Sequence, residues 1–191
     1  MRYSKPRDSD LIDAVESCES ISIRQSIWRV VLDGRDPCQC SSPGGRWDNE
    51  TFEVLYTSQL QDGAIAEMLF HLKKGQPVLP SKLTYRIFEL NLDLDDVLNL
   101  GDKDLLSPLG VNTAQFGKLT YANRNDEYTR TQKIGETAHF LGFSGIVLPN
   151  ARWNCNNVVL FCDRLEGDAL EEIRDHGPID WNAWSKSNTA G

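Results

Sequence analysis

The chain has 191 residues, of which 40% are hydrophobic and 25% are charged, an ordinary composition for a globular domain with one hydrophobic core. Its formal net charge of −8 excludes binding of DNA or RNA over a whole face, because an acidic surface repels the phosphate backbone; a small basic pocket for one dinucleotide stays open. No apolar run approaches the roughly 20 residues that span a bilayer, and the N-terminus lacks the apolar segment of a secretory signal.

Cysteine usage adds a prediction about the compartment. The five cysteines are odd in number and have no paired spacing, which argues against a disulfide framework. We therefore expect a reducing compartment and a cytoplasmic protein. The five are Cys18, Cys38, Cys40, Cys155 and Cys162.

The first third of the chain is predicted to hold a short helix and two strands. Residues 8–19 carry apolar side chains at helical spacing, and residues 27–31 form an apolar run typical of a strand. Residues 33–45 are rich in Gly, Pro, Cys and Ser and predict a loop. A second strand is predicted over residues 52–56.

A longer helix is predicted to follow the second strand. Ser58 and Gln61 match a capping box, in which the serine hydroxyl satisfies a free backbone N–H of the first turn. Gly75 is the expected end of this helix, and Lys73 and Lys74 lie in its last turn, where cations suit the helix dipole.

The second half is less regular. Residues 85–92 alternate as a strand does, and residues 131–141 show helical periodicity that ends at a glycine. Residues 145–148 and 158–162 are two short apolar runs that predict strands. Residues 93–128 are the least regular part, with only short helical pieces.

Three further segments complete the chain. Residues 150–157 are too polar for the core and are predicted to form a link between strands. Asp93, Asp95 and Asp96 favour a solvated turn over a calcium loop, because the glycine and distal glutamate of an EF-hand do not follow in place. The tail from residue 166 is predicted to contain a short helical stretch and a frayed end.

These elements predict a fold class. Five or six strands mixed with three or four helices, in no regular βαβ rhythm, favour an α+β domain over a doubly wound sheet. We expect a single compact domain with a central mixed or split sheet flanked by helices.

Two arginines are candidates for binding an anion. Arg29 lies in the apolar strand, where a buried guanidinium needs an acidic partner, a ligand or solvent. Arg46 follows Gly44 and Gly45, which let the backbone approach a ligand closely, and its planar fork suits phosphate oxygens. The alternatives are a solvent-facing or salt-bridged Arg29, and a solvated Arg46 in an ordinary hairpin turn.

Tyr56 and Glu67 are candidates for the reacting end of such a site. Tyr56 ends a strand, where its phenol could stack on a flat ring or donate a hydrogen bond; the alternative is a half-buried residue at the core edge. Glu67 and His71 are the only polar residues in 63–72 and share one stripe of the helix. This stripe faces either solvent or a cleft. In a cleft the carboxylate could stabilise positive charge as a glycosidic bond breaks.

Five ordered blocks of the sequence resemble the RES domain, a family of bacterial toxin enzymes, over a recognisable core of about residues 27–162. The blocks are Trp28-Arg29, the GGRWD of residues 44–48, the VLY of 54–56, the AIAE of 64–67, and the pair SGIVLPNAR of 144–152 with NVVLF of 157–161.

The resemblance implies a fold and a function. The fold would be ADP-ribosyltransferase-like, in one domain over residues 1–191, with an N-terminal helix (8–19) and a C-terminal tail (166–191) outside the core. The implied enzyme degrades NAD by cleaving the nicotinamide–ribose bond, with water or phosphate as acceptor. The implied partner is an Xre-like antitoxin that covers the pocket. No metal, direct nucleic acid contact or membrane is expected, and an oligomer stays open.

Site residues carry over position by position. The characteristic Arg and Glu of the family are Arg29 and Glu67, the implied catalytic pair, and the characteristic Ser is Asn150 here. Asparagine can orient a ribose or an amide but cannot act as a hydroxyl. Asp48 stands where Asn is usual and adds negative charge near the proposed anion site. The implied substrate-binding residues are Arg46, Trp47, Tyr56 and Asn150.

Two other functions stay open from the sequence. The first is an ADP-ribosyltransferase that modifies a protein or RNA target. The second is a non-catalytic module of the same fold that binds NAD or a partner, an alternative that Asn150 suggests.

Overall fold

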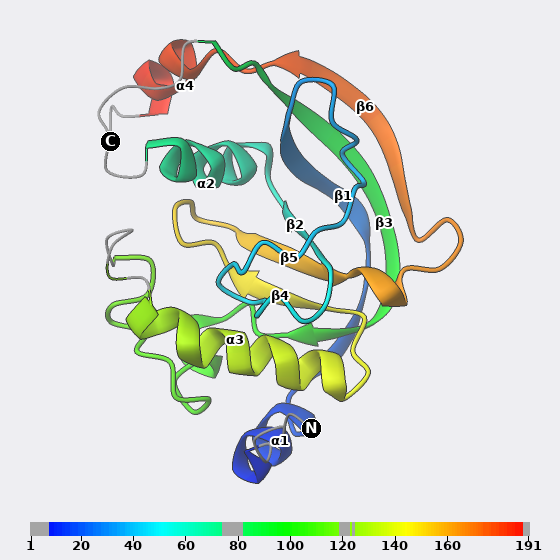
Figure 1. Cartoon of the computed structure of the whole chain (residues 1–191), viewed down its shortest axis with the longest axis vertical. Helices are drawn as coiled ribbons and strands as arrows, with labels where there is room; N and C mark the ends of the chain where they lie inside the picture. Colours follow the sequence, from blue (N-terminus) through cyan, green and yellow to red (C-terminus); the bar gives the residue numbers. More distant parts are fainter. Residues whose placement is uncertain (1–7, 74–81, 119–122, 124, 189–191) are drawn as a thin grey trace, which may run out of the picture.

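The computed structural model describes residues 8–73, 82–118, 123 and 125–188, in which helices surround a central sheet (Figure 1). The strands are β1 (Ser20–Leu32), β2 (Val54–Ser58), β3 (Tyr85–Asn99), β4 (Gly145–Pro149), β5 (Asn156–Phe161) and β6 (Leu170–Pro178). The α-helices are α1 (Ser9–Glu16), α2 (Gln61–Lys73), α3 (Asn125–Phe140) and α4 (Trp181–Asn188). This arrangement confirms the α+β class.

The sheet runs in the order β1-β2-β5-β4-β3-β6, and an additional pairing of β1 with β3 closes its first five strands into a ring. The β1–β3 ladder is long, from Ser20↔Leu98 to Leu32↔Tyr85. By contrast, β1 and β2 share a single residue pair, Trp28↔Ser58. The two strands therefore diverge around this pair, and α2 follows directly after β2 (Figure 1).

The helices bury apolar side chains against different parts of the sheet. Ile134 and Ala138 of α3 pack in the same cluster as Ile146 of β4, together with side chains of α1. Ala64 and Ile65 of α2 pack on the part of the sheet that β1 and β3 form. Full burial of a Leu or Ile side chain contributes roughly 1.5–3 kcal/mol each, so these contacts fix both helices on the sheet.

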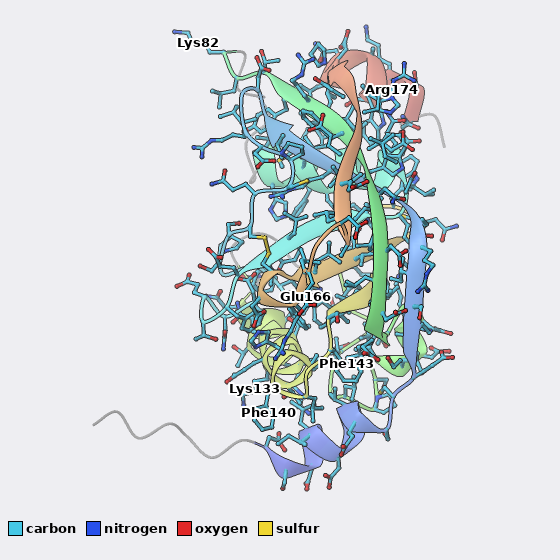
Figure 2. All side chains as sticks on the ribbon, turned by 90° about the vertical axis from the view of Figure 1, so that its right-hand side faces the viewer. Lys82, Lys133, Phe140, Phe143, Glu166 and Arg174 are labelled. Atoms are coloured by element: carbon cyan, nitrogen blue, oxygen red, sulfur yellow. A yellow bond between two sulfur atoms is a disulfide. The ribbon has the colours of Figure 1, made fainter. Side chains whose placement is uncertain are left out.

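The C-terminal helix is tied to α2 and to the loop before β5. The indole Nε1 of Trp184 donates a hydrogen bond to Asp62 Oδ1 at 2.7 Å. Its ring also lies 5.6 Å, centroid to centroid, from that of Trp153 in the loop between β4 and β5. Residues 166–188 are therefore an integral part of the fold. The predicted helical stretch from residue 166 is wrong, because this segment forms β6 along the outer edge of β3 (Figure 2).

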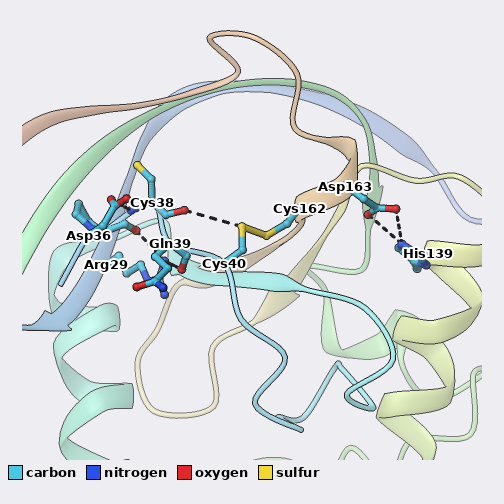
Figure 3. The surroundings of a disulfide bond; sticks show 9 residues. Arg29, Asp36, Cys38, Gln39, Cys40, His139, Cys162 and Asp163 are labelled. Carbon is cyan, nitrogen blue, oxygen red and sulfur yellow. Dashed lines mark hydrogen bonds and ion pairs between the residues drawn. A yellow bond between two sulfur atoms is a disulfide. The ribbon is translucent and has the colours of Figure 1, made fainter.

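The structure contains a disulfide between Cys40 and Cys162 (Figure 3), so the prediction of no disulfide is wrong. The two cysteines are 122 residues apart in sequence, with a Cα–Cα distance of 6.3 Å. Val54 explains their proximity, because it pairs with Ser41 on one side and Phe161 on the other. Strand pairing places the two cysteines together, and their spacing in the sequence does not indicate this pairing. The other three cysteines are free.

Several predicted boundaries also change. The strand predicted over residues 27–31 begins at Ser20, because the alternating segment before it pairs with β3. The strand predicted over 85–92 continues to Asn99. The expected turn at Asp93, Asp95 and Asp96 is therefore wrong: these residues belong to β3, and the first two form salt bridges with Arg24.

The helix predictions change as well. Helix α3 begins at residue 125, six residues before the predicted start. The Ser58 capping box is wrong, because α2 begins at Gln61 and the Ser58 hydroxyl instead contacts Cys155 Sγ and the Asn156 carbonyl. Lys74 and Gly75, the expected end of α2, lie outside the described residues.

Candidate active site

A cavity of about 480 Å³ lies where β1 and β2 diverge, within the range of small-molecule sites. Its walls come from β1, β2, α2, the loop around residues 41–47 and the loop after β4. The structure brings five of the six candidate residues to this cavity, and Asn150 is the exception. The five that line it are Arg29, Arg46, Trp47, Tyr56 and Glu67.

Arg29 reaches the cavity from β1 and is held by backbone carbonyls. Its Nη1 donates to the carbonyl oxygens of Pro37 at 2.7 Å and Gln39 at 3.0 Å (Figure 3). Burial lowers the pKa of Arg29 to about 10, and the nearby Cys38 and Asp36 act in the opposite direction. The side chain is therefore a cation at neutral pH. Its position is fixed by carbonyl groups, a kind of partner that the sequence prediction did not include.

The GGRWD turn is organised around Asp48, whose side chain is fully buried. Its two carboxylate oxygens accept hydrogen bonds from the backbone N–H groups of Gly44 and Gly45 at 2.8 and 2.7 Å. The same carboxylate accepts a 2.7 Å hydrogen bond from the Tyr56 hydroxyl. Three donors thus hold the extra negative charge of Asp48 inside the turn. A Cβ at Gly45 would stand 2.5 Å from the Tyr56 hydroxyl oxygen, so this position requires glycine.

Tyr56 contributes its ring to the cavity, whereas its hydroxyl forms hydrogen bonds within the protein. The hydroxyl oxygen accepts a hydrogen bond from the backbone N–H of Trp47 at 3.0 Å and donates to Asp48. Burial, and then the charge of Asp48, raise the pKa of Tyr56 well above its ordinary value. Tyr56 is therefore neutral, and it offers a ligand an aromatic surface.

Arg46 is a buried ion-pair partner rather than a free cation. Its Nη1 forms a salt bridge with Glu127 Oε1 of α3, and the two side chains are 15% and 6% exposed. Its guanidinium lies over the rings of Phe116 and Tyr128, 4.8 and 5.4 Å from their centroids. Burial lowers the pKa of Arg46, opposed by Tyr128 and Glu67. The salt bridge fixes where Arg46 meets the cavity.

Glu67 projects from α2 into the cavity, which decides between the cleft and solvent alternatives. Its Oε1 accepts a hydrogen bond from the backbone N–H of Ala151 at 3.0 Å and another from Asn157 Nδ2 at 3.4 Å. His71, one turn further along α2, also lines the cavity. The polar stripe that the sequence revealed is therefore a wall of the cavity.

Asn150 lies behind the cavity wall, with a side chain that is 4% exposed. Its Oδ1 accepts from the backbone N–H groups of Arg152 at 2.7 Å and Trp153 at 2.8 Å. Its Nδ2 donates to the Gly63 carbonyl at 3.3 Å and to Asn157 Oδ1 at 2.8 Å. All four hydrogen bonds are internal, so Asn150 shapes the loop that carries Ala151.

Sequence reasoning missed Arg152 and Tyr128 as cavity residues. The guanidinium of Arg152 lies 3.4 Å from the centroid of the Phe70 ring and donates to the Gly117 carbonyl. Burial lowers the pKa of Arg152, and Glu67 opposes the shift. Arg152 stood at the end of the SGIVLPNAR block and could have been found there. Tyr128 had no such signal, because it lies in the irregular segment 93–128.

The sequence of the chain was compared with models of known protein families. The chain matches the model of the RES domain over residues 27–182. The chain belongs to the RES domain family. The match extends beyond the recognisable core predicted from the sequence and includes β6. No curated protein matches this RES domain chain closely enough to add to the assignment.

Solved structures show the same fold. Seven chains match this RES domain protein. One, from the crystal structure of the M. tuberculosis MbcT–MbcA toxin–antitoxin complex, superposes with a TM-score of 0.77 at 17% sequence identity. The match covers 94% of this chain and 97% of that one. The likeness spans nearly the whole of both molecules.

Two further features concern the described part of the chain alone. No helix there is long and apolar enough to cross a membrane. Within the same residues, no group of three or more His, Cys, Asp or Glu side chains is arranged to hold a metal ion.

Proposed function

We propose that this RES domain protein is a toxin-type enzyme that degrades NAD by cleaving the bond between nicotinamide and ribose. The observation that carries the proposal is the Glu67 carboxylate, which backbone and side-chain donors hold in a cavity that also presents guanidinium groups and an aromatic ring. NAD has matching chemistry: an anionic pyrophosphate, a flat cationic nicotinamide and a ribosyl carbon that becomes positive as the bond breaks.

Each cavity residue receives a role. Arg29, Arg46 and Arg152 surround the cavity, and we assign to them the pyrophosphate or an acceptor phosphate. The ring of Tyr56 stacks on nicotinamide, since its hydroxyl is committed to Asp48. Trp47 completes this wall of the cavity.

The reaction follows from these roles. The C1′–N bond breaks, its electron pair neutralises the nicotinamide nitrogen, and Glu67 stabilises the positive ribosyl centre. Water attacks C1′ and releases a proton to solvent, or an ionised phosphate oxygen attacks C1′ directly, so that a C1′–O bond replaces the C1′–N bond. Because nicotinamide leaves as a neutral molecule, positioning and electrostatics matter more than a strong acid.

A protein partner belongs to the same proposal. The similar structure comes from a toxin–antitoxin complex. We propose that this chain also pairs with an antitoxin, of Xre-like type, that covers the cavity.

The test is NAD turnover by the purified protein, with and without phosphate, with products resolved by mass. Glu67→Gln is expected to lower the rate at least about 100-fold, the usual cost of removing one electrostatic stabiliser. Glu53→Gln is the matched control, because Glu53 is exposed and lies outside the cavity.

Each outcome decides something. Free ADP-ribose identifies water as the acceptor, and its phosphorylated form identifies phosphate. Labelled ADP-ribose on a protein or RNA overturns the proposal in favour of a macromolecular target. NAD that binds and stays intact overturns it in favour of a binding module.

A further inference from the structure

Two hydrogen bonds hold the Glu67 carboxylate, and one comes from a residue with no role so far. The backbone N–H of Ala151 reaches Oε1 at 3.0 Å, and Asn157 Nδ2 reaches the same oxygen at 3.4 Å. Among the described residues, none forms a hydrogen bond with Oε2. In this part of the chain, Oε1 is therefore the carboxylate oxygen that hydrogen bonds anchor.

Asn157 is well placed to anchor a side chain. It lies at the start of β5, where its backbone pairs with Ser58 of β2 on one side and Leu148 of β4 on the other. A residue held between two strands has a fixed backbone, so its short side chain has few orientations. Asn157 also lines the cavity.

The orientation of the Asn157 amide follows from Asn150. The Asn150 atom that faces the backbone N–H groups of Arg152 and Trp153 must be its oxygen, because only an oxygen accepts from two donors. Its nitrogen therefore faces Asn157, so the Asn157 atom that it meets at 2.8 Å must be the oxygen. The remaining atom of the Asn157 amide is the nitrogen, which points to Glu67.

We propose that Asn157 is a positioning residue for Glu67, and that Asn150 acts through it by fixing its amide orientation. The proposal rests on the proposed function, in which Glu67 is the catalytic carboxylate. The chain Asn150–Asn157–Glu67 connects the buried Asn150 to the reacting centre without placing Asn150 in the cavity.

The first test replaces Asn157 and compares it with its neighbour. Asn157→Ala is expected to lower kcat for NAD cleavage about 10- to 100-fold while KM changes less than about 2-fold, because a misplaced catalytic group costs chemistry more than binding. Asn156→Ala is the matched control: Asn156 precedes Asn157 on the same strand, and its side chain lies against Gly101 outside the cavity. Equal losses in the two variants overturn the proposal.

A second variant tests the donor directly. In Asn157→Asp the new carboxylate can still accept from Asn150 but cannot donate to Glu67. We expect its kcat to be at least as low as that of Asn157→Ala at neutral pH. It should recover relative to the wild type as pH falls toward about 4, because a protonated carboxyl donates again. A merely structural role for Asn157 would give a constant ratio across this range, and that result overturns the proposal.

A double-mutant cycle shows whether Asn157 acts through Glu67. In a Glu67→Ala background, Asn157→Ala is expected to have less than about a 2-fold further effect on the residual rate, because the group to be positioned is gone. A full 10- to 100-fold further loss would assign Asn157 an independent role and overturn the proposal.

The crystal structure of Asn157→Ala separates failure of this proposal from failure of the proposed function. We expect the Glu67 carboxylate to turn away from its wild-type position or to occupy more than one orientation. If the wild type does not consume NAD, the proposed function is wrong. The positioning claim is then decided by this structure alone: an unchanged, singly occupied Glu67 rotamer overturns it.

Discussion

At the scale of single residues, the site depends on polar groups that satisfy one another behind the cavity surface. Asp48, Tyr56 and the backbone of the GGRWD turn form one such group, in which the Tyr56 hydroxyl both accepts from Trp47 and donates to Asp48. A buried carboxylate that loses a hydrogen-bond donor destabilises the folded state, because no water replaces the lost partner. The hydroxyl of Tyr56 should therefore contribute to stability more than a surface tyrosine does.

We expect Tyr56→Phe to lower the free energy of unfolding by about 2 kcal/mol, because the Trp47 N–H and one lone pair of Asp48 lose their partner. Urea denaturation measures this change. Tyr85→Phe is the control, since that ring packs edge-on against Trp181 away from the turn, and it should cost less than about 0.5 kcal/mol. A loss of that small size in Tyr56→Phe would contradict the argument.

The stability difference between the wild type and Tyr56→Phe should also depend on pH. Folding raises the pKa of Tyr56 above its ordinary value, so the folded state retains the phenolic proton more tightly than the unfolded state does. The contribution of this raised pKa to the free energy of unfolding is fully present below about pH 10. It is lost as pH rises further, by about 1.4 kcal/mol per pH unit. The stability difference between wild type and Tyr56→Phe should therefore shrink above pH 10 and stay constant below it.

At the scale of elements, one wall of the cavity depends on the contact between α3 and the GGRWD turn. Gly135 of α3 faces the carbonyl group of Trp47 so closely that a Cβ has no room. This contact brings Glu127 of α3 to Arg46. The position of one helix thus sets the position of a cavity cation.

Gly135→Ala tests this contact. We expect it to destabilise the protein, whereas Gly→Ala at an ordinary helix position is stabilising. Helix propensity alone would favour alanine by about 1 kcal/mol. We expect instead a loss of about 2–3 kcal/mol in unfolding free energy, because the new methyl group overlaps the Trp47 backbone. Lys133→Ala, at an exposed position on the same helix, should stay within about 0.5 kcal/mol. A neutral or stabilised Gly135→Ala would show that α3 has room to move.

The sequence predicts those parts of the site that have a local pattern. Glu67 and His71 could be recognised because a polar stripe on an otherwise apolar helix has few explanations. Asn150 has no such local signal, since its four partners come from α2, β5 and the following loop. The same reason explains Ser58, whose hydroxyl was expected to cap a helix and instead contacts residues about 100 positions away.

At the scale of the whole molecule, the Cys40–Cys162 disulfide connects the loop held by Arg29 to the end of the central strand β5 (Figure 3). A cross-link between residues so distant in sequence restricts the unfolded chain strongly. Its effect on stability should therefore be global.

Reduction with a dithiol is expected to lower the free energy of unfolding by about 5 kcal/mol, the size that loop-closure entropy gives for a sequence separation of 122 residues. Thiol titration of the denatured chain should count three free cysteines before reduction, namely Cys18, Cys38 and Cys155. The Cys40→Ser/Cys162→Ser double variant should not respond to the dithiol, whereas Cys18→Ser should respond as the wild type does. Five free thiols before reduction would show that the cross-link is absent.

The contact between Trp153 and Trp184 has an optical consequence. Two indoles 5.6 Å apart are within range of excitonic coupling and energy transfer, and one is hydrogen-bonded to Asp62, five residues before Glu67 on α2. The other belongs to the loop that donates to Glu67. Near-ultraviolet circular dichroism and intrinsic fluorescence can therefore follow rearrangements beside the carboxylate in solution without a label, and Trp153→Phe removes that signal at its source.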